Sequence, residues 1–305
     1  MSDSTVSQEL FTIRDFVRYA VSEFEASNIF FGHGTDNAYD EAVWLVMGAL
    51  HLPLDTVENF WDARLISAER EKLATFIEAR VTMHTPTAYL LKEAWLQGFK
   101  FYVDERVLIP RSFIAELLLD NLVTSSLGSW IEYPEMITSA ADICTGSGCL
   151  GILLAHTFPD AVVDVVDISK DAIDVCNINI ENYGLQDQVS AIESDMFGAL
   201  TGKTYDLIIS NPPYVDAPSM AALPKEYQNE PQLALGSGDA GLDHTHTLLR
   251  ETAQHLNDGG LLIVEIGHNR DALEAAYPHV AFNWLEVSSG NQFVFLLTKA
   301  QLESI

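Results

Sequence analysis

The chain has 305 residues, of which 48 % are hydrophobic, and 44 acidic residues against 16 basic ones give a net charge of −28. This length predicts about two domains, each able to bury a core. No apolar run approaches the ~18 residues of a membrane span. The polar, acidic amino terminus also lacks the basic and then apolar order of a secretory signal, so we expect a cytoplasmic protein.

The charge and the cysteines narrow the possible partners. An acidic surface repels phosphate backbones and attracts basic partners, although the same charge also serves solubility or a salty habitat. Cys144, Cys149 and Cys176 show no metal-type spacing. They predict free thiols in a reducing compartment and no metal site.

Residues 1–94 are expected to form a small helical domain. Apolar residues recur there at helical spacing, from Leu10 to Phe24 and again from Ala42 to Ala49. Ser67 is placed to cap a third helix that ends near Met83.

Residues 95–124 are expected to link two domains. The β-rich sequence on both sides of Asp104-Glu105-Arg106 predicts a hairpin that turns there. A helix is expected over 112–123 and a loop over 124–139.

From residue 140 onward, strand and helix patterns alternate, which predicts a mainly parallel sheet with helices on both faces. In such sheets, ligands bind at the carboxyl ends of the strands. The expected strands cover residues 140–144, 161–167, 188–193, 205–210, 260–266, about 278–283, and 292–298. Residues 125–305 are therefore the expected catalytic domain.

A glycine-rich loop follows the first of these strands. Gly146 to Gly151 match GxGxxG between a strand and a helix, the context in which a dinucleotide or nucleoside cofactor is bound. Asp167 ends the second strand, where an acid accepts hydrogen bonds from ribose hydroxyls, unless it only caps the next helix. Asp195 and Met196 follow the third strand, in reach of an adenine ring, although Met196 also suits a core. Nicotinamide dehydrogenases and S-adenosylmethionine methyltransferases both fit.

The fourth strand ends in Asn211-Pro212-Pro213-Tyr214, which offers no group to exchange the proton that a dehydrogenase needs. Asn211 and the Pro212 carbonyl instead offer two acceptors that do not titrate, held by the fixed φ of proline. Two such acceptors suit a planar NH2 group, and Tyr214 adds a flat apolar face. A Pro-rich turn without chemistry is the alternative interpretation.

These motifs resemble those of class I methyltransferases that methylate the N5 amide of glutamine in proteins, relatives of the release-factor methyltransferases. The resemblance implies an α/β fold: a Rossmann-like, seven-stranded, mostly parallel sheet with a small helical N-terminal domain, which binds the protein substrate, and a linking β-hairpin. It implies that Asn211, Pro212, Pro213 and Tyr214 form the clamp for the target nitrogen. S-adenosyl-L-methionine would contact Asn211 and a set of residues at the strand ends: Cys144, Thr145, Gly146, Ser147, Gly148, Asp167, Asp195 and Met196.

The sequence resembles one branch of that family in additional segments. Pro110-Arg111-Ser112 stands where release-factor enzymes usually carry Pro-Arg-Pro, and "AWLQGFKFYVDERVL" and "LPKEYQNEP" are similar to the PrmB type. That branch modifies large-subunit ribosomal protein number three, a basic protein. The implied partner is this protein, before or during ribosome assembly, with no direct nucleic-acid binding and no membrane.

Three other functions stay open. Release factors would present the same glutamine chemistry. An amino-methyltransferase acting on adenine or cytosine needs a similar clamp, but it also needs a basic surface, and residues 1–95 and 96–305 are both net acidic. A binding factor that keeps the cofactor fold without catalysis is the third.

Several residues have two interpretations. Cys144 replaces the first glycine of the usual loop, which we expect to require a negative φ, and we interpret it as a small packed residue rather than a reactive thiol. Glu230 either shapes a substrate channel or fixes a loop. Arg111 either approaches the cofactor or pairs with Glu116. His244 and His246 are expected at the surface.

Overall fold

The structure, a computed structural model, describes residues 3–119, 127 and 130–305. The chain divides into two compact units. The helical unit contains the chain up to Ala94 together with Val103–Glu105 and Pro224–Glu230. The sheet unit contains Trp95–Tyr102, Arg106–Leu223 and Pro231–Ile305. Within the described ranges, no helix has the length and apolar character needed to cross a membrane.

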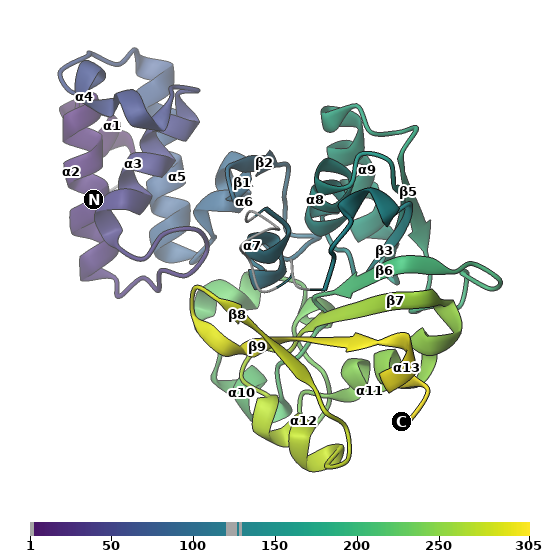
Figure 1. Cartoon of the computed structure of the whole chain (residues 1–305). Helices are drawn as coiled ribbons and strands as arrows, with labels where there is room; N and C mark the ends of the chain where they lie inside the picture. The colour runs from purple at the N-terminus through teal and green to yellow at the C-terminus, as the bar shows by residue number, and fades with distance from the viewer. Residues whose placement is uncertain (1–2, 120–126, 128–129) are drawn as a thin grey trace. The chain divides into compact units, whose positions relative to one another are not determined.

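The helical unit packs its helices around one apolar core, in which Phe16, Phe24 and Leu45 are completely buried. Helices α2 (Ile13–Ala26), α3 (Ala38–Ala49) and α5 (Ser67–Thr82) contact one another and lie side by side in Figure 1. Ser67 is the first residue of α5 and not its cap, because Ile66 occupies the cap position and its N–H donates to Glu69 at 2.9 Å. The helical segments are α1 (Asp3–Glu9), α2 (Ile13–Ala26), α3 (Ala38–Ala49), η1 (Leu54–Thr56), α4 (Val57–Phe60), α5 (Ser67–Thr82), α6 (Thr87–Leu91) and η3 (Lys225–Asn229).

A buried ion-pair network fixes residues 224–230 within the helical unit. The guanidinium of Arg80 donates to Glu41 and, at 3.2 Å, to Glu226. Glu226 also lies 2.8 Å from Nδ1 of His84. Burial raises the pKa of Glu226, but hydrogen bonds from His84 and the charge of Arg80 outweigh it and lower that pKa. The short segment Pro224–Glu230, which is far from the first helices in sequence, is therefore a structural part of their unit.

The linking hairpin exists, but its expected turn at residues 104–106 is wrong. Strands β1 (Ala94–Leu96) and β2 (Phe99–Phe101) are joined by Gln97 and Gly98, whose φ values are +50° and +81°. Two consecutive residues with positive φ form the short turn that matches the natural twist of a hairpin. Helix α7 (Phe113–Leu119) confirms the first part of the helix expected over 112–123, and the rest of that helix falls outside the described residues. The expected loop over 124–139 contains one short helix, η2 (Pro134–Met136), and begins outside the described residues.

The sheet unit is built on seven strands in the order β5-β4-β3-β6-β7-β9-β8. Pairing is parallel from β5 to β7, and β9 is antiparallel to both β7 and β8. This confirms the predicted Rossmann-like, mostly parallel sheet. The strands are β3 (Ser139–Ile143), β4 (Val162–Asp167), β5 (Val189–Glu193), β6 (Tyr205–Ser210), β7 (Leu256–Glu265), β8 (Asn283–Val287) and β9 (Gly290–Thr298).

The strand expected near 278–283 is wrong, since β8 only begins at Asn283. Pro278 has no N–H to give to a ladder, and a turn in which Val280 donates to Tyr277 at 3.0 Å occupies the segment.

Helices cover both faces of the sheet, as Figure 1 shows. Alternate strand residues point to opposite faces, so Leu207 and Ile209 pack in one core cluster and Ile208 in the other. The first cluster includes residues of α7, α8 and α9, and the second includes residues of α11, α12 and α13. The remaining helical segments are α8 (Cys149–Thr157), α9 (Lys170–Tyr183), α10 (Ala217–Ala222), η4 (Gln232–Ala234), α11 (Asp243–Glu251), η5 (Thr252–His255), α12 (Arg270–Ala276) and α13 (Lys299–Leu302).

The order of strands reverses between β3 and β6, and a ligand site is expected at the carboxyl ends of the strands around that point.

Candidate active site

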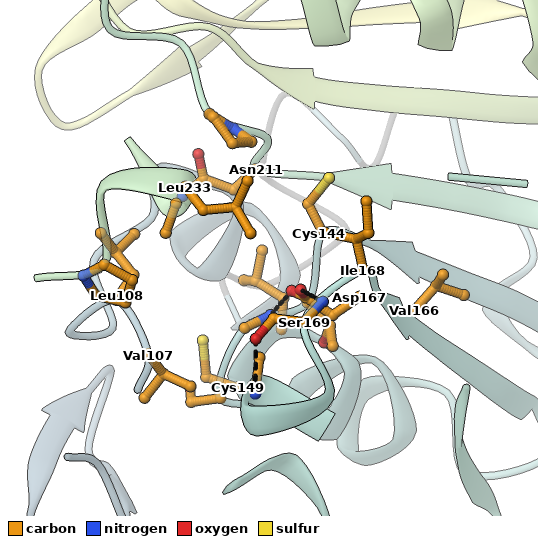
Figure 2. A pocket seen from close by; sticks show the side chains of 18 of the residues that line it. Val107, Leu108, Cys144, Cys149, Val166, Asp167, Ile168, Ser169, Asn211 and Leu233 are labelled. Atoms are coloured by element: carbon orange, nitrogen blue, oxygen red, sulfur yellow. Dashed lines mark hydrogen bonds between the residues drawn. The ribbon is translucent and has the colours of Figure 1, made fainter. Parts of the chain in front are cut away.

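A pocket in the sheet unit opens at the carboxyl ends of β3, β4, β5 and β6. Most residues singled out from the sequence line it: Cys144, Thr145, Gly146, Ser147, Asp167, Asp195, Met196, Asn211 and Pro213. Gly148, Pro212 and Tyr214 are not among the lining residues. In Figure 2, Asn211 and Cys144 lie on one side of Asp167, and Val107 and Cys149 lie on the other. The structure thus brings the strand-end motifs together around one cavity.

The glycine loop turns tightly between β3 and α8. Thr145 donates from its backbone N–H to the carbonyl of Val166 on β4 at 2.9 Å, which ties the loop to the neighbouring strand. Gly148 has a φ of +82°, and a Cβ there would lie 2.5 Å from Sγ of Cys176, so only glycine fits. A Cβ on Gly146 would meet no atom within 4 Å, so the loop exposes its backbone to open space.

Cys144 has a φ of +64°, so the expectation of a negative φ is wrong. The sharp exit from β3 imposes the left-handed conformation that glycine usually takes, at a cost of about 1–2 kcal/mol for a residue with a side chain. Its Sγ lies 3.8 Å from Sδ of Met196. Burial and the nearby charge of Asp167 raise the pKa of the Cys144 thiol, which keeps it protonated and favours the packing role over a reactive one.

Asp167 connects the end of β4 to the glycine loop. Its Oδ2 accepts from the backbone N–H of Gly146 at 2.9 Å, and its Oδ1 accepts from that of Ser169 at 2.9 Å. Burial raises the pKa of Asp167 despite these hydrogen bonds. The cap of α9 is Ser169, whose Oγ accepts from Ala172, so helix capping does not account for Asp167. Each carboxylate oxygen retains a lone pair for a ligand hydroxyl.

Asp195 and Met196 follow β5 at the pocket wall. Asp195 is exposed, whereas Met196 is buried and has a φ of +47°. A polar and an apolar group therefore stand side by side at this end of the pocket.

Asn211 holds its side-chain amide in a defined orientation. Nδ2 donates to the backbone carbonyl of Arg111 at 3.2 Å, which directs Oδ1 the other way. The Oδ1 atom is buried and accepts no hydrogen bond from any residue in the described part of the chain. An unpaired buried acceptor costs about 1–3 kcal/mol, so a site retains one when a ligand supplies the missing donor. Glu116, one of the two partners expected for Arg111, accepts hydrogen bonds from the backbone N–H and the hydroxyl of Ser288.

Tyr214 is supported from the side of β7. Its hydroxyl lies 3.5 Å from Oε1 of Glu265, and its backbone carbonyl accepts from Asn269 at 2.7 Å. A Cβ on Gly267, whose φ is +55°, would lie 2.7 Å from the Tyr214 ring, so the ring packs directly on this glycine.

The structure also locates His244 and Glu230, which had two interpretations or an expected surface position from the sequence. His244, expected at the surface, is half-buried and lines the pocket, with Nδ1 2.8 Å from Oγ of Ser237, and burial lowers its pKa. Glu230 is buried in the helical unit beside His33 at 3.5 Å, which favours the loop-fixing interpretation. The local sequence around His244 does not signal that this side chain lines the pocket. Its position depends on the path of the long segment between Tyr214 and α11 (Asp243–Glu251).

Comparisons with known proteins find a family match and several full-length relatives. The family model of the methyltransferase small domain matches residues 115–223. The chain is 57 % identical over 296 residues, 97 % of each chain, to the ribosomal protein uL3 glutamine methyltransferase of Neisseria gonorrhoeae. It is 48 % identical to the Bordetella pertussis protein of that name, over 97 % of this chain and 98 % of the relative. It is 42 % identical to the Francisella tularensis protein, over 97 % and 93 %.

The similarity of this chain to solved structures is weaker. One is the hMettl16 catalytic domain in complex with an RNA hairpin, with 14 % identity and a TM-score of 0.49 over 75 % of this chain and 80 % of that one. Another is a ribosomal protein L11 methylase from Lactobacillus delbrueckii, with 18 % identity and a TM-score of 0.42 over 68 % and 90 %.

Proposed function

The chain belongs to the family of ribosomal protein uL3 glutamine methyltransferases, and from this membership and the pocket we propose that it methylates the N5 side-chain amide of a glutamine in uL3. The methyl donor is S-adenosyl-L-methionine. The observation that carries the proposal is the buried Oδ1 of Asn211, an oriented acceptor with no protein donor. An amide NH2 is a donor that fills it, and the nitrogen is then the atom presented to the pocket.

The residues of the pocket fit S-adenosyl-L-methionine. The open space beside Gly146 accepts close approach by the methionine part, together with Cys144, Thr145 and Ser147 of the same loop, while Gly148 lets the loop turn. Asp167 has free lone pairs for the ribose hydroxyls. Asp195 and Met196 flank the adenine, one as a polar and one as an apolar contact. The bound cofactor supplies an electrophilic methyl group on a sulfonium.

The clamp activates a poor nucleophile. An amide nitrogen has a delocalised lone pair, and the carbonyl oxygens of Asn211 and Pro212 each accept one of its N–H groups. This places partial negative charge beside the nitrogen, where positive charge develops during transfer. Pro212 and Pro213 fix the backbone φ, and Tyr214 packs against the glutamine side chain. In-line positioning contributes ~7–11 kcal/mol to such reactions.

The substrate protein is held mainly outside the pocket. We assign residues 1–94 as the substrate-binding domain, 95–124 as the link, and 125–305 as the methyltransferase domain. The helical unit is acidic and exposes aromatic side chains, with Phe30 at 44 % and Tyr39 at 50 % exposure. Such a surface complements a basic ribosomal protein. The acceptor is uL3 in the cytoplasm, before or during its assembly into the ribosome.

Transfer of labelled methyl groups to purified acceptors tests the proposal. Purified enzyme is incubated with labelled S-adenosyl-L-methionine and with uL3, a release factor, or nucleic acid. We expect label in uL3. Label in the release factor alone would mean that the same glutamine chemistry acts on a different protein. Label in nucleic acid would contradict the proposal. Cofactor binding without transfer to any acceptor would favour a non-catalytic binding factor.

A further inference from the structure

The last residue of β7, Glu265, is a fully buried carboxylate beside the clamp. In the parallel pairing of β6 with β7, Val264 is opposite Ser210, so Glu265 stands level with Asn211 at the carboxyl edge. The sequence motifs that suggested the clamp give no role to this residue. Its position alone makes it a candidate for controlling the clamp.

The hydrogen bonds of Glu265 join two separate segments. Its Oε2 accepts from Oγ of Ser112 at 2.6 Å and from the backbone N–H of Phe113 at 2.9 Å. Its Oε1 faces the hydroxyl of Tyr214 at 3.5 Å. One carboxylate therefore reaches both the end of the clamp and the chain just before α7.

The chain before α7 is the part that orients Asn211. The carbonyl that receives Nδ2 of Asn211 belongs to Arg111, which immediately precedes Ser112. A shift of Ser112 moves this carbonyl and releases the amide, whose oxygen is then free to leave the substrate position. Glu265 thus acts on both ends of the tetrapeptide, through Arg111 on Asn211 and directly on Tyr214.

The cost of this arrangement is high. The donors around Glu265 are the Ser112 hydroxyl, backbone amides at the start of α7 and the Tyr214 phenol, and none of them carries a positive charge. Burial raises the pKa of Glu265 to about 7, and the hydrogen bonds from Ser112 and Phe113 only partly oppose this. Buried carboxylates are rare unless a specific need keeps them. At Glu265 the need is to hold Ser112, Phe113 and the Tyr214 hydroxyl in place.

We propose that Glu265 is a positioning residue for methyl transfer, which holds Asn211 and Tyr214 in their working geometry through Ser112, Phe113 and the Tyr214 hydroxyl. The inference rests on the proposed function. It adds a residue that contacts neither the cofactor nor the substrate amide and acts through those that do.

The test compares Glu265→Ala and Glu265→Gln with a matched control. Asp206→Asn removes a carboxylate at the opposite end of β6, where it accepts from Thr138 at 2.9 Å and from Asn257 at 2.7 Å. We expect Glu265→Ala to lower kcat roughly 10²-fold, since a 1 Å misplacement costs about that much. Glu265→Gln retains an acceptor for Ser112 and Phe113, so it loses less. Cofactor Kd stays within a few-fold in both, and Asp206→Asn keeps the wild-type kcat.

A double variant separates positioning from simple destabilisation. Ser112→Ala removes one bond of the same path, so combined with Glu265→Gln it should lose less than the product of the two single losses in kcat. When Ser112→Ala is combined with Asp206→Asn instead, the loss in kcat should equal the product of the two single losses.

Wild-type kcat in Glu265→Gln and Glu265→Ala would overturn the inference, and so would parallel loss of cofactor binding and turnover. If Glu265→Ala does not fold, Glu265→Gln and Ser112→Ala decide on the same criteria. Wild-type enzyme that fails to methylate uL3 would instead refute the proposed function.

Discussion

Replacement of Asn211 by alanine removes an oriented acceptor of the pocket, whose buried Oδ1 has no donor among the described residues. The loss can be estimated from the contacts of this side chain. Deleting one preorganised hydrogen-bond partner of a reacting group in a water-poor site costs about 2.7–4 kcal/mol, or about 10²–10³-fold in kcat. Asn211→Ala should therefore lower single-turnover methyl transfer to uL3 by at least this factor.

Stability should respond in a different way. The substitution removes a hydrogen bond of about 1 kcal/mol to Arg111, but it also removes the desolvation cost of the unpaired Oδ1, which is of similar size. We expect the free energy of unfolding without ligands to change by no more than about 1 kcal/mol. Cofactor Kd should stay within a few-fold, because the glycine loop and Asp167 are intact.

The assay pairs single-turnover transfer at saturating cofactor with calorimetric titration of S-adenosyl-L-methionine. Asn257→Ala is the control, since Asn257 donates to Asp206 at 2.7 Å near the other end of the sheet. An undiminished rate would refute the clamp. Equal losses of rate and of cofactor affinity would make Asn211 a cofactor-binding or folding residue.

Three further perturbations have defined outcomes. Asp167→Ala should raise the cofactor Kd by at least about 10-fold, because a hydrogen bond to a charged group contributes about 1.5–3 kcal/mol, and unchanged affinity in a titration would remove the ribose assignment. Arg80→Met leaves Glu41 and Glu226 buried without their cation, so denaturant unfolding should show a loss of about 3–5 kcal/mol, and a loss below 1 kcal/mol would contradict a tightly coupled network. Burial raises the pKa of Glu265 from 4.5 to about 7, so the folded protein keeps a proton that the unfolded chain releases. The stability from this group is complete below pH 4.5 and is lost as pH rises through 7. Between pH 4.5 and pH 8, the free energy of unfolding measured in urea should therefore fall by about 3 kcal/mol more in the wild type than in Glu265→Gln. Parallel pH profiles of the two proteins would exclude this titration.

The parts of the site that local sequence could predict are those at strand ends. Gly146 and Asn211 each follow an apolar strand, Asp167 ends one, and parallel strands bring their carboxyl ends to one edge. Their presence around one pocket therefore follows from the strand pattern and the alternation of helices.

The parts that could not be predicted depend on contacts between distant segments. Glu265 and Ser112 are 153 residues apart, and only the folded structure, in which Ser112 donates to Glu265, shows that they meet. Glu226 is buried and accepts a hydrogen bond from Arg80, which is 146 residues away in sequence, and no local motif signals this pairing.

Two local errors have local causes. The sequence does not signal the turn at Gln97-Gly98, because glutamine rarely takes a positive φ. The positive φ of Cys144 is unexpected for the same reason, since its side chain disfavours this conformation.

Mass mapping of methylation on ribosomal proteins tests the central claim most directly. Ribosomes from cells that lack this enzyme are compared with ribosomes from the parent cells and from cells complemented with the Asn211→Ala variant. The account predicts that one glutamine of uL3 loses the mass of a methyl group in the first and third samples and carries it in the parent. A fully methylated uL3 in cells without the enzyme, or a missing methyl group on a release factor or on nucleic acid instead, would contradict it.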